Sequence, residues 1–155
     1  MNIHDVQQIP LTVHEDDRGY LFEIIHGTDP FVPQFGQVYV VGDRIEKIVR
    51  AFHKHDELHD WFCIVKGSAK FVLVDDRADS PTHRKVDMLV GSARQASVIV
   101  VPPGVYHGWM SLEPDTILVS TASHEYNREQ PDEVRVPPDY FNELIGADPW
   151  EIKGK

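Results

Sequence analysis

Short runs of β-branched and aromatic residues recur along almost the whole chain, and this pattern limits the fold more than any other feature. The predicted strands are residues 20–25, 37–41, 47–53, 61–65, 69–74, 85–90, 97–101 and 116–121. Turn-forming residues such as Pro102, Pro103 and Gly104 separate these runs, and sustained helical periodicity is nearly absent. Many short strands joined by tight turns predict an all-β fold that is closed or nearly closed, for which a jelly roll is a standard solution.

One helix is expected near the C-terminal end of the chain. Asp139 could cap a helix over residues 140–145, and Gly146 could end it. The 155 residues have the length of one ordinary domain, and 41% of them are hydrophobic, which is enough to bury a core. The sequence contains no linker or internal repeat. We therefore expect a single domain over residues 1–155.

The net charge of −10 limits the classes of partner, because a strongly acidic protein repels nucleic-acid phosphates and anionic lipids. Neither nucleic acid nor membrane is an expected partner. No segment has the pattern of a signal peptide, and no apolar run approaches the roughly 20 residues that a membrane helix needs. The single cysteine, Cys63, lies in an apolar run and suits a reducing compartment. A cytoplasmic protein is expected.

The strongest chemical signal is a His-Lys-His run at residues 53–55, followed by Asp60 and, further along, by His107. Residues two apart in a strand project to the same face, so both histidines of the run can face the interior of a barrel. A turn at Gly104 would bring His107 across to meet them. This two-part pattern is typical of cupin barrels. Three imidazoles and a carboxylate can hold a divalent transition metal, and neutral imidazoles can also act as acids or bases near neutral pH.

The residues around this cluster resemble those of the dTDP-4-dehydrorhamnose 3,5-epimerase family. Asp16–Glu23 is similar to that family's Asp-x-Arg-Gly-x-Phe-x-Glu segment, and Phe35–Gln37 resembles the stretch before its second sheet strand. Val49–His53 resembles its Leu-Arg-Gly-Leu-His strand. Asp76–Thr82 is similar to its Asp-x-Arg-x-x-Ser-Pro-Thr turn, and Pro102–Gly108 is similar to its Pro-x-Gly-x-x-His-Gly segment. The similar segments stand in the family's order and run from about Asp16 to Asp139. They define the fold more firmly than the reaction.

The resemblance implies a cupin or jelly-roll barrel with a short C-terminal helix, a homodimer with strand exchange and no required cofactor. The implied substrate is a nucleoside-diphosphate 4-keto-6-deoxy sugar. His53 takes the position of the catalytic base, and Arg50 that of the group that stabilises the enolate. Asp139 is the nearest candidate for the carboxylate that orients His53. With such a carboxylate in place, activity should fall on acidification as the histidine is protonated.

The same resemblance gives candidate substrate-binding residues. Arg18 would contact the nucleotide phosphates together with Glu23 and Gln37, since arginine offers paired donors to phosphate oxygens. Trp109 lies two residues from His107 and should line the same cavity, whereas Trp61 adjoins Asp60 and should point outward. The full set of expected substrate contacts is Arg18, Glu23, Gln37, His55, His107, Trp109 and Tyr126.

Two positions depart from the family pattern. Asp60 stands where the family has a lysine, and Val119 stands at or near the tyrosine that returns a proton to the sugar. Tyr39, Tyr106 or Tyr126 could supply the missing hydroxyl.

Three functions therefore follow from the sequence. The first is an epimerase or isomerase acting through His53. The second is a metal-dependent cupin enzyme, either an oxygenase or an isomerase, with His53, His55, Asp60 and His107 as ligands of one divalent transition metal. The third is a sugar-binding cupin without catalysis.

Overall fold

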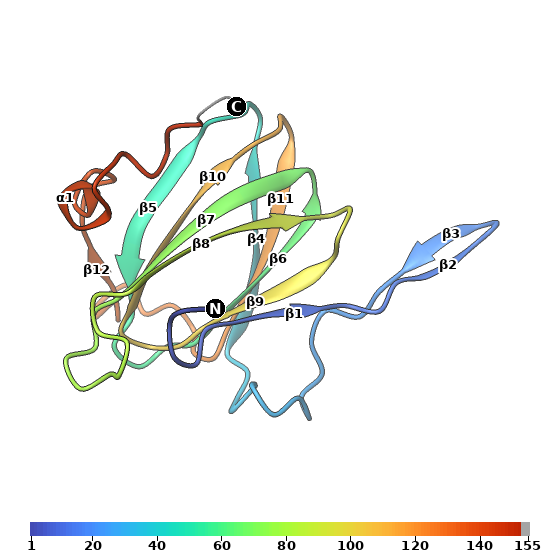
Figure 1. The fold of residues 1–155 in the computed structure, drawn as a ribbon. Coiled ribbons are helices and arrows are strands. Elements are labelled where there is room, and N and C mark those ends of the chain that lie inside the picture. Colours follow the sequence, from blue (N-terminus) through green and yellow to red (C-terminus); the bar gives the residue numbers. More distant parts are fainter. Residues whose placement is uncertain (153–155) are drawn as a thin grey trace.

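Two antiparallel five-stranded sheets face each other in the computed structural model, which describes residues 1–152 (Figure 1). The first sheet has the order β1 (Gln7–Pro10), β9 (Ser97–Val101), β6 (Asp60–Lys66), β11 (Thr116–Ala122) and β4 (Gln37–Asp43). The second has the order β12 (Val134–Arg135), β5 (Val49–Lys54), β10 (Val105–Ser111), β7 (Ser68–Asp75) and β8 (Val86–Ser92). The predicted all-β jelly-roll class is confirmed.

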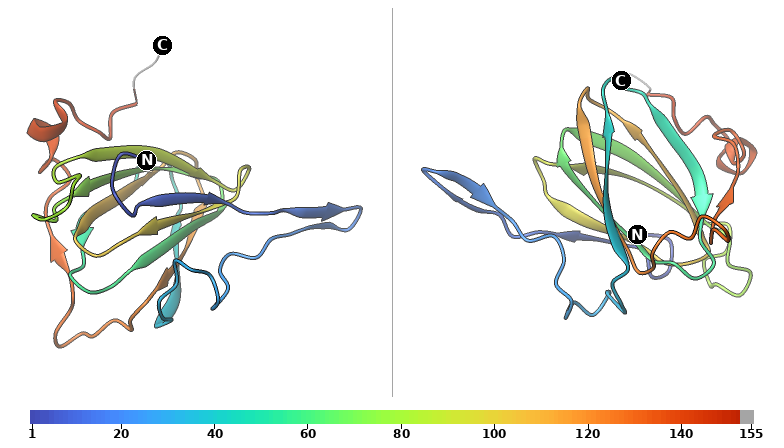
Figure 2. Two further views of the ribbon diagram at one scale, coloured as in Figure 1. Left: turned by 60° about the horizontal axis from the view of Figure 1, so that its bottom comes forward. Right: turned by 180° about the vertical axis from the view of Figure 1, so that it is seen from behind.

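A two-stranded hairpin leaves the barrel as an arm, made of β2 (His14–Asp16) and β3 (Gly19–Leu21). Figures 1 and 2 show it extending away from both sheets. The side chains of Tyr20 and Leu21 on this arm are 66% and 60% exposed. No residue of β2 or β3 belongs to the three core clusters of the described residues, so the arm leaves these apolar side chains in solvent.

The core divides into one cluster inside the barrel and one on the outer face of each sheet. Side chains from both sheets fill the interior, among them Phe62, Phe71 and Trp109. The outer face of the second sheet packs against the C-terminal segment, and that of the first sheet against residues 24–32. Trp61 is 1% exposed in this last cluster, so it points outward as alternation along β6 predicted.

The C-terminal helix begins later than the sequence predicted. Helix α1 spans Asn142–Ile145 after Phe141, and no side chain caps it. The predicted cap at Asp139 is wrong, because this residue contributes only its main-chain carbonyl, which accepts from the N–H of Asn142. Gly146 ends the helix in the left-handed conformation, as predicted. Within residues 1–152, no helix is long and apolar enough to cross a membrane.

Seven of the eight predicted strands are present with shifted ends, whereas of the predicted strand 20–25 only Tyr20 and Leu21 belong to a strand, β3. Four further strands were not predicted. β1, β2 and β12 are short and carry polar residues or proline. β10 mixes Gly108 with histidine and tryptophan, so it lacks the uniform β-branched composition of its neighbours. Gly108 is needed because a Cβ there would lie 2.3 Å from the Cβ of Ala51 on β5.

An irregularity between β5 and β10 sets the direction of two important side chains. His53 pairs with His107, and Arg50 pairs with Trp109, so three steps along β5 match two steps along β10. The extra residue in β5 is a β-bulge, which reverses the alternation of side chains on one side of it. Arg50 and His53 consequently face the same interior, although they are an odd number of residues apart.

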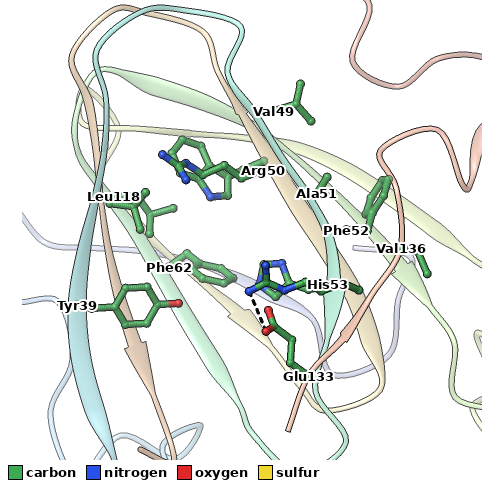
Figure 3. A pocket seen from close by; sticks show the side chains of 13 residues that line it. Tyr39, Val49, Arg50, Ala51, Phe52, His53, Phe62, Leu118, Glu133 and Val136 are labelled. Carbon is green, nitrogen blue, oxygen red and sulfur yellow. Dashed lines mark ion pairs between the residues drawn. The ribbon is translucent and has the colours of Figure 1, made fainter. Parts of the chain in front are cut away.

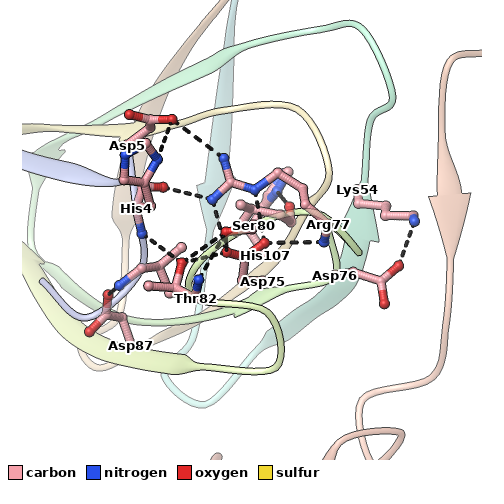
Figure 4. Close-up of polar contacts among 12 residues, drawn as sticks. His4, Asp5, Lys54, Asp75, Asp76, Arg77, Ser80, Thr82, Asp87 and His107 are labelled. Carbon is pink, nitrogen blue, oxygen red and sulfur yellow. Dashed lines mark hydrogen bonds and ion pairs between the residues drawn. The ribbon is translucent and has the colours of Figure 1, made fainter.

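The turn between β7 and β8 is held by a buried carboxylate, that of Asp75 (Figure 4). Its oxygens accept hydrogen bonds from Arg77 at 2.8 and 2.9 Å, and from the hydroxyls of Ser80 and Thr82, both at 2.6 Å. The side chain of Asp75 is completely buried. The network also reaches the N-terminal segment, because Arg77 donates to the carbonyl of His4 at 2.7 Å.

Candidate functional site

A cavity of about 530 Å³ lies between the two sheets and has the size of a small-molecule site (Figure 3). The first sheet and the second sheet supply facing walls, and the segment around β12 forms part of the edge. The lining residues are Tyr39, Val41, Phe62 and Leu118 from the first sheet, Val49, Arg50, Ala51, Phe52, His53 and Trp109 from the second, and Glu133, Arg135 and Val136 from the segment around β12.

Three histidines meet beside this cavity. His53 and His107 are direct cross-strand partners, and their ring centroids are 4.1 Å apart. The His55 ring lies 5.5 Å from that of His53 and 5.7 Å from that of His107. One ring nitrogen from each of the three falls within 4.8 Å of the other two. The structure thus brings together the three imidazoles that the sequence grouped.

Main-chain carbonyls fix the orientation of two of these rings. Nδ1 of His107 donates to the carbonyl of Val105 at 3.0 Å, and Nδ1 of His55 donates to the carbonyl of Asp132. A carbonyl oxygen can only accept, so both Nδ1 atoms carry hydrogen and the Nε2 atoms point elsewhere. Each Nε2 lies 3.3 Å from Oδ2 of Asp60, the first residue of β6.

His53 lines the cavity, and within residues 1–152 no hydrogen bond or ion pair to its ring is present. Burial, together with the neighbouring His107 and His55, lowers its pKa from 6.5 to about 2. The expected carboxylate at Asp139 does not lie against it: Asp139 is exposed in the turn before α1, and among the described residues no hydrogen bond or ion pair joins the two. Acidification to pH 5 should leave His53 neutral, contrary to the prediction from sequence.

Arg50 is held on the wall of the cavity by a buried carboxylate. Its Nε and one terminal nitrogen donate to Oδ1 of Asp43 at 3.0 and 2.8 Å, and its guanidinium lies 5.8 Å from the centre of the Trp109 ring. Asp43 is 3% exposed. A cation fixed in this way can stabilise negative charge on a ligand without having to reorganise first. Trp109 lines the cavity, as alternation from His107 predicted.

Tyr39 is the tyrosine that the structure places in the cavity. Its hydroxyl points inward from β4 (Figure 3). Burial raises its pKa, and the negative charge of Asp60 raises it further, so the hydroxyl keeps its proton near neutral pH. Val119 lies between the cavity-facing Leu118 and Ser120, the register partner of Tyr39, so its side chain points to the other face.

Several expected contacts lie elsewhere in the chain. Arg18 pairs with Asp16 on the arm, and Glu23 lies 3.3 Å from His26 near the foot of the arm. Gln37 accepts from the N–H of Tyr126 at 3.1 Å, and neither of these two residues lines the cavity. Within one chain, therefore, His53 and Arg50 line the cavity but Arg18, the expected phosphate-binding arginine, does not.

Four residues in or beside the site were not found from the sequence. Glu133 and Arg135 form an ion pair of 2.9 Å at the edge of the cavity, and Arg135 pairs with His53 across β12 and β5. Asp132 positions His55 and also accepts from three main-chain N–H groups of residues 56–58. These residues lie in a polar stretch without periodicity, which looks like an ordinary surface loop. No sequence pattern around Asp43, at the end of β4, predicted its contact with Arg50.

The sequence matches a family described as dTDP-4-dehydrorhamnose 3,5-epimerase over residues 1–140. It is 33% identical to the probable low-salt glycan biosynthesis epimerase Agl13 of Haloferax volcanii, over 89% of this chain and 90% of that protein. It is 34% identical to the spore coat polysaccharide biosynthesis protein SpsL of Bacillus subtilis, over 93% of this chain and 94% of that protein.

Solved structures share the fold. A dTDP-4-dehydrorhamnose 3,5-epimerase from Bacillus anthracis, with TDP and PPi bound, superposes with a TM-score of 0.85 at 24% identity, covering 99% of this chain and 89% of that one. ChmJ, a 3′-monoepimerase from Streptomyces bikiniensis in complex with dTDP-quinovose, superposes with a TM-score of 0.83 at 23% identity, covering 93% of this chain and 75% of that one.

Proposed function

The chain belongs to the dTDP-4-dehydrorhamnose 3,5-epimerase family and is a sugar-nucleotide epimerase, and on that premise we propose that its cavity moves a proton next to the ketone of a nucleoside-diphosphate 4-keto-6-deoxy sugar. The observation that carries the proposal is the convergence of a neutral imidazole, a fixed guanidinium and a protonated phenol on one cavity. These groups can act as base, oxyanion stabiliser and acid, respectively.

In this mechanism His53 removes the proton from the carbon beside the ketone. The lone pair on its cavity-facing nitrogen is free, since no described residue donates to it. The enolate oxygen that forms carries negative charge, which Arg50 stabilises from the same wall. We propose that no metal or other cofactor is required, because proton transfer needs only these side chains.

Exchange with solvent deuterium tests whether the protein abstracts this proton. Purified protein is incubated in deuterated water with dTDP-linked 4-keto-6-deoxy sugars, and carbon-bound deuterium is measured by mass spectrometry and NMR. Deuterium beside the ketone supports the proposal. Binding of the nucleotide sugar without any exchange would instead establish the non-catalytic alternative.

We propose that Tyr39 returns the proton to the face opposite His53, because it is the tyrosine that lines the cavity. Tyr106 packs in the outer cluster with Phe141, and Tyr126 is 54% exposed outside the cavity, so neither is placed for this role.

Tyr39→Phe should therefore lower the rate of inversion by about 10²–10⁴-fold, the usual contribution of a positioned acid. Exchange at the proton that His53 removes should continue, because the base is intact. Product stereochemistry and deuterium content are followed together by NMR, with Tyr106→Phe as the matched control. Inversion at the wild-type rate in Tyr39→Phe would rule out this role.

The homodimer belongs to the proposal as well, since the cavity of one chain lacks the expected phosphate-binding residue. The arm carries Arg18 away from its own barrel (Figure 2). Edge strand β4 presents Val38 and Val40, which are 57% and 66% exposed, on the face opposite the cavity-lining Tyr39. We propose that these apolar surfaces pair between two copies, so that the arm of each brings Arg18 towards the diphosphate bound by the other.

Val40→Asp should convert the dimer to a monomer, because two buried carboxylates would face an apolar surface. Light scattering after gel filtration measures the mass, and nucleotide binding should weaken together with dimerisation. Met88→Asp, on the edge strand β8 of the other sheet, is the matched control and should remain a dimer. A wild-type mass that corresponds to one chain would refute the dimer.

The names of the relatives support a role for the product in surface-polysaccharide or glycan biosynthesis. A cytoplasmic location fits the single cysteine, Cys63, which is fully buried as a neutral thiol.

A further inference from the structure

The polar cluster of His55, His107 and Asp60 has a deficit of positive charge at its centre. The Nε2 atoms of both rings carry lone pairs, because their Nδ1 hydrogens are used by main-chain carbonyls. Both lone pairs point at Oδ2 of Asp60, which also carries lone pairs, at 3.3 Å. Oδ2 of Asp60 and Nε2 of His107 are buried, and neither has a hydrogen-bond partner in the described part of the chain.

Such an arrangement is unfavourable unless a proton or a metal ion lies at the centre, since buried acceptors without donors cost free energy. The convergence of three imidazole nitrogens on one point favours the metal ion. We propose that His53, His55 and His107 bind one divalent transition-metal ion of the zinc type, with Asp60 as the carboxylate that balances its charge. The proposed ligands come from β5, the residue after it, and β10, while Asp60 belongs to the facing sheet.

The donor set fits such an ion. Three imidazole nitrogens already lie within 4.8 Å of one another, and zinc binds imidazole nitrogen at about 2.0–2.1 Å, so small ring movements complete the site. Histidines that bind metals commonly donate their other N–H to a carbonyl or carboxylate, as His55 and His107 do here. Imidazole ligands favour zinc, nickel, copper and iron over magnesium or calcium.

Metal binding and proton abstraction exclude each other at His53. A neutral imidazole has one lone pair, and a bound ion would occupy the lone pair that the base needs. The metal-free protein is therefore the active epimerase, and the metal-loaded protein is inhibited. This second part rests on the proposed function, whereas the binding site itself does not.

The test uses protein treated with a chelator and then given Zn²⁺ or Co²⁺ alone. One equivalent of metal per chain should remain after gel filtration, as measured by elemental analysis, and Co²⁺ should give visible absorption bands of a nitrogen-ligated site. Asp60→Asn should weaken the affinity by roughly 10–100-fold, as expected for a supporting carboxylate. His55→Gln should weaken it at least as much, and the exposed His83→Gln is the matched control.

Circular dichroism confirms that each variant is folded before metal is added. Loss of bound Zn²⁺ in His55→Gln with retention in His83→Gln supports the site, and no stoichiometric metal in the wild type overturns it. Deuterium exchange into the keto sugar should fall at least about tenfold on loading and recover with chelator. Binding without any effect on exchange overturns the exclusion at His53, whereas no exchange even in metal-free protein refutes the proposed function and leaves the metal site standing.

Discussion

His53→Gln is expected to lower deuterium exchange into the 4-keto sugar by about 10²–10⁴-fold, the contribution of a positioned general base. Glutamine keeps much of the ring's volume and polarity but cannot accept and release a proton at this step. Its effect should appear in the rate of exchange at saturating substrate, because Arg50 and Trp109 still line the cavity. Single-turnover incubations in deuterated water, read by mass spectrometry, measure the rate.

A nearby histidine outside the cavity provides the control. The His59 ring stacks on Trp61 at a centroid distance of 6.1 Å on the outer face of the first sheet, so His59→Gln should exchange at the wild-type rate. Asp139→Asn should also retain exchange, since the exposed Asp139 does not touch His53. Equal rates for His53→Gln and the wild type would remove His53 from the mechanism.

Asp75→Ala should lower the free energy of unfolding by roughly 3–5 kcal/mol, as expected when one partner of a buried ion pair is removed. The mutation removes the closer of the two carboxylates that pair with Arg77, leaving Asp5 at 3.6 Å, and it leaves the hydroxyls of Ser80 and Thr82 without this acceptor. Urea unfolding followed by circular dichroism measures the change. Asp76→Ala removes the neighbouring surface pair with Lys54 and should cost no more than about 1 kcal/mol.

The same carboxylate should make stability depend on pH. Burial alone would raise the pKa of Asp75, but hydrogen bonds from Arg77, Ser80 and Thr82 hold it well below its ordinary value. A lowered pKa stabilises the folded state above the unfolded pKa of about 3.9, and this stabilisation is lost as the pH falls towards the folded value. Below about pH 5 the wild type should lose stability more steeply than Asp75→Asn. Parallel curves for the two proteins would contradict this role.

Alternation along strands, together with the two-part cupin pattern, was sufficient to predict the centre of the site. Alternation along strands and the turn at Gly104 predicted that the His-Lys-His run, Asp60 and His107 would lie close together, and the structure brings these residues together. Trp61 and Trp109 point to opposite faces for the same reason. Alternation explains which face each side chain takes, whereas the meeting of His107 with His53 depends on the pairing of β10 with β5, which only the two-part cupin pattern indicated.

Residues placed by other parts of the chain were harder to predict. Glu133 and Arg135 reach the cavity because the two-residue strand β12 pairs with β5, and no composition signal marks so short a strand. Asp139 follows this strand, but the chain passes His53 already at Arg135, and Asp139 lies beyond it, exposed in the turn before α1. Arg18 matches a family motif, but the motif does not indicate whether its side chain would contact the cavity of its own chain or that of a second copy.

The bulge in β5 makes the chemistry of the cavity depend on chain length as well as on residue type. Deleting one residue between Arg50 and His53 would keep both side chains and all core positions beyond them, but would restore strict alternation and turn one of the two outward. Substitutions in the strand can therefore vary the cavity wall one side chain at a time. A change of one residue in length would instead turn either Arg50 or His53 out of the cavity, so that the two side chains would no longer face the same ligand.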